Sequence, residues 1–285
     1  MPIIQTQNKK VQQFKGLHLY HAGFSSCAQR VRITLAEKDL AWTSHVVDLA
    51  NKEHATAEYQ SINPKGLIPT FVDNGQVIIE SVDIIDYIEQ KFPGTALMPE
   101  STTGQTQVRQ WMAKADRAQH GLKLLTHEFL FKGGRRMTSE QLETFLNDHH
   151  NEELGEFMRQ FSSEEGFSKA MIDQAVQEHY DLFQELDRAL DGQVWLVENQ
   201  FSLADVAWTP NVHRMDVMAY PLERHPNLNA WYHRLQERPS YVNALQKQEP
   251  VKLLAHFQKY TQQRQQEQTD VCQFGPLAAT EICNT

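Results

Sequence analysis

The chain has few cysteines, no long apolar run and no excess of positive charge. Its three cysteines, Cys27, Cys272 and Cys283, are scattered over 285 residues and lack the paired spacing of a disulfide framework. No stretch reaches the roughly 18 apolar residues that a membrane-spanning helix needs. The first residues, MPIIQTQNKK, lack the apolar core of a secretory signal. We therefore expect a cytoplasmic protein with reduced thiols and no membrane partner.

The charge balance and the histidines exclude two further classes of partner. The formal net charge is -9, and nucleic-acid binding needs a basic face that neutralises phosphates. We expect no nucleic-acid partner. Of the 13 histidines, His149 and His150 are adjacent, and adjacent helical residues point about 100° apart, which suits a shared metal poorly. His150 and Glu153 are better spaced, but nothing completes a ligand set, so we expect no metal.

The first 95 residues have the pattern of a small α/β domain. The expected elements are strands at 17–22 and 42–49 with a helix between them, a hairpin around Asp73-Asn74-Gly75, and a helix capped by Ser81 that runs to about Lys91. The Asn-Gly pair is a strong hairpin signal because both residues accept a positive φ. The order βαβ-ββα predicts a thioredoxin-like mixed sheet.

From residue 104 to about 260 the sequence is helical in character, with few β-branched runs. Its periodicity predicts helices at 104–131, 138–160, 168–190, 202–219 and 227–246. The charged stretch NDHHNEELGEF reads as solvent-facing helix. The expected organisation is an α/β domain at 1–95, a linker at about 94–103, an all-helical domain at 104–260, and a polar, partly mobile tail at 261–285.

The stretch GFSSCAQRVR, residues 23–32, lies where the first strand becomes a helix. The N–H groups and the dipole of a helix N-terminus favour a negative charge. A hydroxyl of Ser25 or Ser26 can donate to a thiolate there, and Cys27 in the first turn can itself become a thiolate. The simpler interpretation is that the serines cap the helix and Cys27 packs inside. Arg30 and Arg32 fall on the polar side of this helix.

Two more stretches suit a ligand with a peptide backbone and an amino-acid head. In NPKGLIPT, Pro69 follows Ile68 at a strand start, where a cis proline leaves the preceding backbone free for a ligand. In IIESVDIIDYI, Glu80 can pair with an ammonium group and Ser81 with a carboxylate. An ordinary strand-entry proline and a simple capping serine are the alternatives. Together the three stretches provide a thiolate site, a backbone clamp and an amino-acid site, which are the groups of glutathione.

These motifs resemble the cytosolic glutathione transferase superfamily over residues 17–245. SSCAQRVRITLAEKDL is most similar to the zeta-class signature and to bacterial relatives that dehalogenate substrates or cleave aryl ethers. NPKGLIPT and ES resemble the family's cis-proline loop and γ-glutamyl site. FSLADVAWTP resembles its folding motif, with Ser202 and Asp205 as a capping box. The resemblance implies a thioredoxin-like domain followed by an all-helical domain, glutathione as cosubstrate and a homodimer.

The resemblance also implies roles for single residues. Ser25 activates the glutathione sulfur, with Ser26 and Cys27 close by; Ile68, beside Pro69, binds the cysteinyl backbone; Glu80 and Ser81 hold the γ-glutamyl group. His54 occupies a position that often contacts the glycine end, and Lys52 and Lys65 compete with it for that role. The helical domain departs from the relatives by its extra length at about 130–175, which covers the pocket, extends a dimer contact, or does neither.

For the electrophile, the helix expected at 104–131 offers Trp111, Asp116 and His120. Asp116 and His120 are four residues apart and share a helix face, so they can line a pocket in which His120 acts as a general acid. The alternative is an ordinary surface pair. Trp208, Trp231 and Tyr232 read as core.

The residues together with this resemblance imply four alternative functions. The first is a transferase in which the glutathione thiolate attacks a small aromatic or unsaturated electrophile. The second is a glutathione-dependent isomerase, reductive dehalogenase or ether-cleaving enzyme. The third is a thiol-disulfide enzyme that uses Cys27, and the fourth is a non-catalytic binding protein on the same fold.

Overall fold

The computed structural model describes residues 3–134 and 136–278. Its contacts divide the chain into two compact units. The first unit contains Met1–Ala96, Met137–Ser163 and Asn243–Gln248, and the second contains Leu97–Arg136, Glu164–Val242 and Glu249–Thr285. The boundary after Ala96 lies in the expected linker. The division differs from the continuous ranges we expected because residues 137–163 group with the α/β unit.

A five-stranded sheet with the order β1-β5-β4-β2-β3 forms the centre of the first unit. Its strands are β1 (Ile3–Ile4), β2 (Leu17–His21), β3 (Thr43–Val46), β4 (Thr70–Asp73) and β5 (Gln76–Ile78). β2 and β3 are parallel and the other pairs are antiparallel. The predicted hairpin is confirmed, with positive φ at Asn74 and Gly75. The short strand β1 was not predicted.

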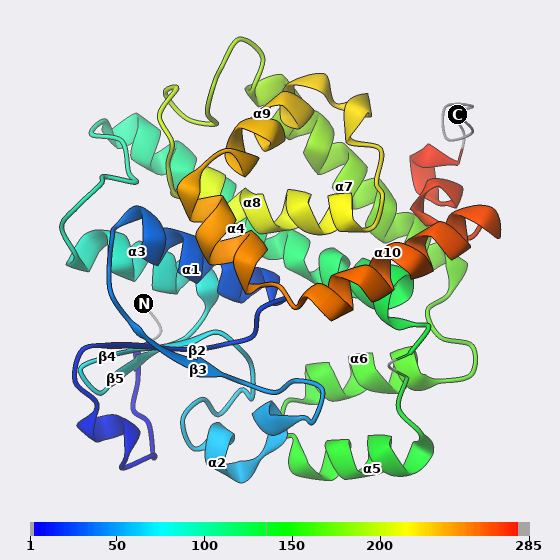
Figure 1. The fold of residues 1–285 in the computed structure, drawn as a ribbon, viewed down its shortest axis with the longest axis horizontal. Helices are drawn as coiled ribbons and strands as arrows, with labels where there is room; N and C mark the ends of the chain where they lie inside the picture. Colours follow the sequence, from blue (N-terminus) through cyan, green and yellow to red (C-terminus); the bar gives the residue numbers. More distant parts are fainter. Residues whose placement is uncertain (1–2, 135, 279–285) are drawn as a thin grey trace. The chain divides into compact units, whose positions relative to one another are not determined.

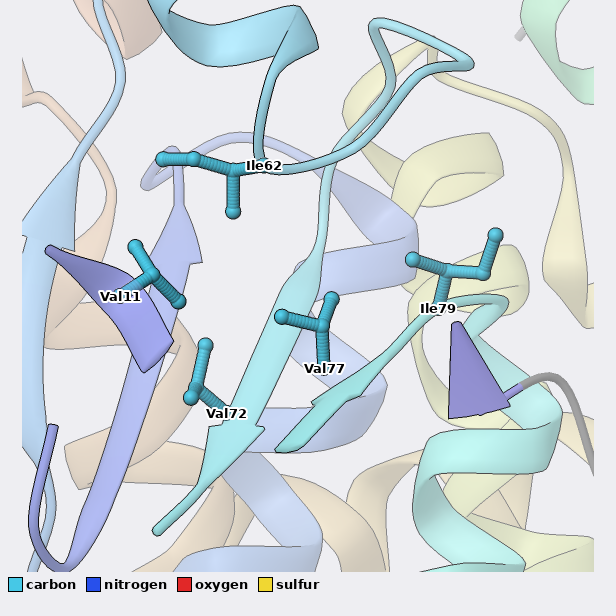
Figure 2. Packing of buried hydrophobic residues seen from close by; sticks show 5 residues of the cluster. All are labelled: Val11, Ile62, Val72, Val77 and Ile79. Atoms are coloured by element: carbon cyan, nitrogen blue, oxygen red, sulfur yellow. The ribbon is translucent and has the colours of Figure 1, made fainter. Parts of the chain in front are cut away.

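Helices and loops cover both faces of this sheet. The helices of the first unit are α1 (Ser26–Glu37), α2 (Ala57–Gln60), α3 (Ser81–Lys91), α5 (Ser139–Asp148) and α6 (Glu152–Ser162). α1 and α3 pack together on one face (Figure 1). Figure 2 shows the cluster on the opposite face, formed by Val11, Ile62, Val72, Val77 and Ile79. A sheet covered on both sides is a rigid base for the loops at its ends.

The prediction of a single helix at 138–160 is wrong, because the helix is interrupted between the end of α5 and the start of α6. His149 has an extended backbone, with φ -101° and ψ 118°, and Asn151 caps α6 by accepting from the Leu154 N–H. The charged run therefore contains its own stop and start signals. It is not uniformly solvent-facing either, since the His149 side chain is only 5% exposed.

The second unit is helical, as predicted. Its helices are α4 (Thr102–Thr126), α7 (Lys169–Ala189), α8 (Leu203–Val217), α9 (Pro226–Gln236) and α10 (Val251–Gln266). The capping box of Ser202 and Asp205 at the start of α8 is confirmed. Trp208, Trp231 and Tyr232 are buried as expected. The helix predicted at 227–246 is interrupted rather than continuous: α9 ends at Gln236, and helical turns resume at Pro239 and run to Gln248. Pro239 lies in the first turn after this interruption, where its missing N–H does no harm.

The chain after residue 260 is more ordered than we expected. α10 continues to Gln266, and beyond it Val271 and Leu277 are buried. Arg264 anchors this segment through bonds to the carbonyl and carboxylate of the buried Glu128. Residues 261–278 therefore contain a helix end and buried side chains that the expectation of a polar, partly mobile tail did not include. The remainder, with Cys283, lies outside the described residues.

None of the helices in the described ranges combines the length and the apolar character that a bilayer span requires.

Candidate functional site

Ser25 lies at the junction between β2 and α1 and serves as the N-cap of the helix. Its Oγ accepts a hydrogen bond from the Ala28 N–H at 3.3 Å. Within the described residues no acceptor receives the Ser25 hydroxyl hydrogen. The side chain is partly exposed. The capping role and the donor role are therefore compatible, because the cap uses a lone pair and leaves the proton for a ligand. Ser26 and Cys27, the first two residues of α1, are also partly exposed.

Arg32 holds the turn before Ser25. We expected its side chain on the polar face of the helix, but it is buried. Its guanidinium donates to the carbonyls of Ala22 and Gly23 at 3.1 and 2.8 Å, and to that of Ala244 at 2.7 Å. It also donates to His21 Nδ1 at 3.2 Å. Burial, aided by Arg32, lowers the pKa of His21 to about 4. The sequence offered no local signal for this arrangement, since the apolar stripe of α1 does not include Arg32.

The loop before β4 is organised by two buried side chains that sequence reasoning missed. Asn63 Nδ2 donates to the Leu67 carbonyl at 2.9 Å, and the Tyr59 hydroxyl donates to the same oxygen at 2.8 Å. The Ile68–Pro69 bond that follows is cis, as predicted. The N–H and C=O of Ile68 have no hydrogen-bond partner among the described residues. These two groups can therefore pair with the backbone of a peptide ligand.

Glu80 and Ser81 lie where β5 leads into α3. Glu80 has φ 66° and ψ 116°, a conformation that is unusual for a residue with a side chain. Such backbones often occur at ligand-binding turns. Lys65 Nζ contacts Glu80 Oε1 at 2.6 Å. Glu80, not Ser81, is the N-cap residue, and it makes no side-chain cap bond. The expectation that Ser81 caps this helix is therefore wrong.

Ser81 is instead the first residue of α3 and is bonded to α1. Its Oγ accepts from Arg30 Nη1 at 3.1 Å, and both side chains are buried. Arg30 is therefore a second residue that the helical pattern wrongly placed on the polar side. Because its guanidinium occupies an acceptor position of Ser81, the hydroxyl proton remains available for a carboxylate. The positive charge of Arg30 also favours an anion at this helix start.

The three candidates for the glycine end of the ligand have different surroundings. The His54 ring lies 6.0 Å from the ring of Phe145 and 5.7 Å from that of His149. Burial lowers the pKa of His54 to about 4, so it is neutral at pH 7. Lys52 Nζ donates to the Gln141 carbonyl at 3.2 Å, while Lys65 pairs with Glu80. Lys65 is thus the candidate that lies next to another predicted site residue.

Trp111, Asp116 and His120 belong to the second unit and lie on α4. Trp208 Nε1 donates to the Trp111 carbonyl at 3.1 Å, and Lys114 Nζ lies 4.6 Å from the centre of the Trp111 ring. Asp116 and His120 are both exposed. Their four-residue spacing gives them a common helix face. Their role in binding an electrophile stays a prediction.

Across the part of the chain that the structure describes, no three His, Cys, Asp or Glu side chains gather as potential metal ligands. The first unit instead combines a hydroxyl donor at a helix start, a peptide backbone without a partner and a carboxylate beside a second helix start. Such groups are suited to a thiolate, a peptide unit and an amino-acid head.

Comparison with known proteins agrees with this chemistry. Residues 19–96 match the family described as "Glutathione S-transferase, N-terminal domain", and residues 170–234 match "Glutathione S-transferase, C-terminal domain". The chain is similar to "Glutathione S-transferase hmp2" of Hypomyces subiculosus, with 28% identity over 80% of this chain and 97% of that protein. It is 39% identical to a probable maleylacetoacetate isomerase of Caenorhabditis elegans over 38% of this chain and 51% of that protein.

Among solved structures, the chain is similar to the beta-etherase LigF from Sphingobium sp. strain SYK-6. The TM-score is 0.74 at 26% identity, over 81% of this chain and 99% of that one. The two family matches fall in the expected order along the chain, on the thioredoxin-like sheet and on the helical part. The chain therefore belongs to the glutathione S-transferase superfamily.

Proposed function

We propose that this protein is a glutathione transferase in which Ser25 activates the glutathione thiol for attack on a small electrophile. The observation that carries the proposal is the Ser25 hydroxyl at the N-terminus of α1, whose hydrogen no acceptor receives among residues 3–134 and 136–278. A hydrogen bond from Ser25 to the sulfur favours the thiolate over the thiol. The positive end of the α1 dipole acts in the same direction.

The remaining residues of the site would bind and orient the tripeptide. The N–H and C=O of Ile68, which lack a partner in the part of the chain that the structure describes, suit the cysteinyl backbone. Ser81, with Arg30 behind it, suits the α-carboxylate of the γ-glutamyl group, and Glu80 suits its ammonium group. In the reaction the sulfur forms a thioether bond to carbon. The leaving group departs with the electron pair of the broken bond and takes up a proton.

For the electrophile we propose an aryl ether or a related activated aromatic compound. The similarity to the etherase LigF supports this choice. On an ether, attack by the thiolate at carbon would release an alkoxide or phenolate, and His120 on α4 is our candidate to protonate it. Glutathione-dependent isomerisation, supported by the similarity to a probable maleylacetoacetate isomerase, is the second candidate. On the resemblance alone we also propose a homodimer, which a molar-mass measurement in solution tests.

The test compares Ser25→Ala and Ser25→Asp with wild type. The aspartate keeps an acceptor for the cap but lacks the proton to donate. We expect Ser25→Ala to raise the pKa of the bound thiol by about 1–2 units, which corresponds to one hydrogen bond to a charged group. Ser25→Asp should raise this pKa further, because its carboxylate also repels the thiolate. Ultraviolet absorbance of the thiolate during a pH titration measures this shift. The turnover of an aryl ether or aryl halide should fall in parallel.

Two control variants distinguish activation of the glutathione thiol from the loss of a helix cap and from a thiol-disulfide mechanism at Cys27. Ser168→Ala removes the equivalent cap of α7, which also accepts at 3.3 Å, and should leave the thiol pKa unchanged. Cys27→Ala should retain turnover. If Cys27→Ala abolishes activity while Ser25→Ala retains it, a thiol-disulfide enzyme replaces the transferase. If wild-type protein binds no glutathione, the non-catalytic interpretation replaces both.

A further inference from the structure

The α5–α6 segment, residues 137–163, is attached to the loop that leads to Ile68. Figure 1 shows α5 and α6 beside α2 in the first unit. Several polar contacts join the segment to residues 52–67: Lys52 Nζ to the Gln141 carbonyl at 3.2 Å, Gln60 Nε2 to the Asp148 carbonyl at 2.7 Å, and Asn151 Nδ2 to the Lys65 carbonyl at 3.3 Å. This extra length of chain therefore belongs to the framework of the candidate glutathione loop.

His149, at the break between α5 and α6, makes the central contact. Its Nδ1 accepts from the Asn151 backbone N–H at 3.1 Å. The other ring nitrogen, Nε2, must therefore carry the proton of the neutral ring. That nitrogen lies 3.1 Å from the Gly66 carbonyl oxygen, to which it donates. The ring is buried, so this hydrogen bond is shielded from water.

Gly66 is held from two directions at this point. Its N–H donates to the Asn63 carbonyl at 2.9 Å, and its carbonyl accepts from His149. Its φ is +59°, and a Cβ at this position would lie 2.4 Å from His149 Nε2. Only glycine permits both the backbone conformation and the close approach of the ring. Two residues later comes Ile68, whose backbone N–H and C=O make no hydrogen bond to any residue that the structure describes.

We infer that His149 is a positioning residue of the glutathione site, which acts through the Gly66 carbonyl to hold the Ile68 backbone in its ligand-binding conformation. The inference rests on the proposed function for the identity of the ligand. Asn63 and Tyr59 hold the following carbonyl, that of Leu67, from within the same loop. His149, from the α5–α6 segment, holds the preceding carbonyl, that of Gly66, in the same stretch of backbone.

Two substitutions at this position separate the hydrogen bond from the bulk of the ring. His149→Gln places an amide N–H where Nε2 lies, so it should keep the bond to Gly66. His149→Asn is too short for that bond but can still accept from Asn151. We expect the KM for glutathione to rise about three- to ten-fold in His149→Asn, since one net hydrogen bond is lost. His149→Gln should stay near wild type, as should His150→Asn, which changes the exposed neighbour.

The readouts are chosen so that a general loss of structure gives a different result. The kcat at saturating glutathione and the KM for the electrophile should stay unchanged in His149→Asn. Amide hydrogen exchange in the peptide 63–70 should accelerate in that variant alone. Unchanged exchange and an unchanged KM for glutathione in His149→Asn would overturn the inference. If wild type binds no glutathione, the proposed function fails, while the exchange measurement still tests the hold of His149 on the loop.

Discussion

Acidification should destabilise the first unit through His21. The ring is 2% exposed, and its Nδ1 accepts from Arg32 at 3.2 Å, so the proton of the neutral ring lies on Nε2, 2.8 Å from Ser44 Oγ. A second proton would have to enter at Nδ1, directly against the guanidinium. The pKa of His21 is accordingly lowered from 6.5 to about 4, with burial as the largest cause.

The sign and size of the effect follow from proton linkage. Between pH 6.5 and pH 4 the unfolded chain holds the His21 proton and the folded chain does not, so the free energy of unfolding decreases as the pH falls. The pKa of His21 differs by about 2.5 units between the unfolded and the folded chain. Once both states are protonated, this difference lowers the free energy of unfolding by about 3 kcal/mol. The contribution of His21 to the free energy of unfolding is fully present above pH 6.5 and is lost progressively as the pH falls towards 4.

The assay is urea unfolding at several pH values between 7 and 4, followed by tryptophan fluorescence, to which Trp42, whose ring lies 5.2 Å from that of His21, contributes. His21→Gln removes the titrating group but keeps an N–H for Ser44, so its stability should depend less on pH over this window. His233→Gln, at an exposed position, is the matched control and should keep the wild-type dependence. Equal pH dependence in wild type and His21→Gln would refute the reasoning.

Two predictions concern the second unit. Asp205→Ala should lower the free energy of unfolding by about 3 kcal/mol or more, because buried donors that include Trp231 Nε1 at 2.8 Å lose their acceptor; an Asp205→Ala protein with unchanged denaturant stability would contradict this. Arg264→Met should cost about 2–4 kcal/mol, because it leaves the buried Glu128 carboxylate with Lys132 as its remaining ion-pair partner among the described residues. Limited proteolysis should then cut beyond α10 sooner than in wild type, and an unaltered digestion pattern would argue against the anchor.

The predictions that held depend on short-range chemistry. The hairpin at Asn74-Gly75, the Ser25 cap and the capping box of Ser202 and Asp205 each involve groups within a few residues of one another. Their geometry is therefore encoded in the local sequence. At Pro69 the local sequence left a cis proline and an ordinary strand-entry proline open, the family resemblance favoured the cis form, and the structure contains the cis bond.

The features that were missed depend on partners far along the chain. Arg32 reads as a polar helix residue, but its Nε donates to Ala244, 212 residues away. Arg30 reads the same way and bonds Ser81, 51 residues away. A helical pattern predicts which side chains are apolar. It does not predict that carbonyl groups far along the chain will accept hydrogen bonds from a buried arginine. The attachment of α5 and α6 to the first unit was missed for the same reason.

The candidate site shows the same contrast. Its members could be named from three motifs, but their relations could not. The Lys65–Glu80 pair and the contact of His149 with Gly66 join residues 15 and 83 positions apart. The breaks in the charged segment were encoded by Asn151 as a helix cap, a local signal that the sequence reading overlooked.

The interleaved chain of the first unit has a consequence for synthesis. When Ala96 has left the ribosome, the whole sheet is available to fold, but the helices that hold the loop before Pro69 end at residue 163. At about 5–20 residues per second they follow roughly 3–13 s later. During that interval the nascent sheet carries the Gly66 carbonyl without its histidine and the Arg32 guanidinium without Ala244. A chaperone that binds the nascent chain would therefore bind it during this interval, before these partners have been synthesised.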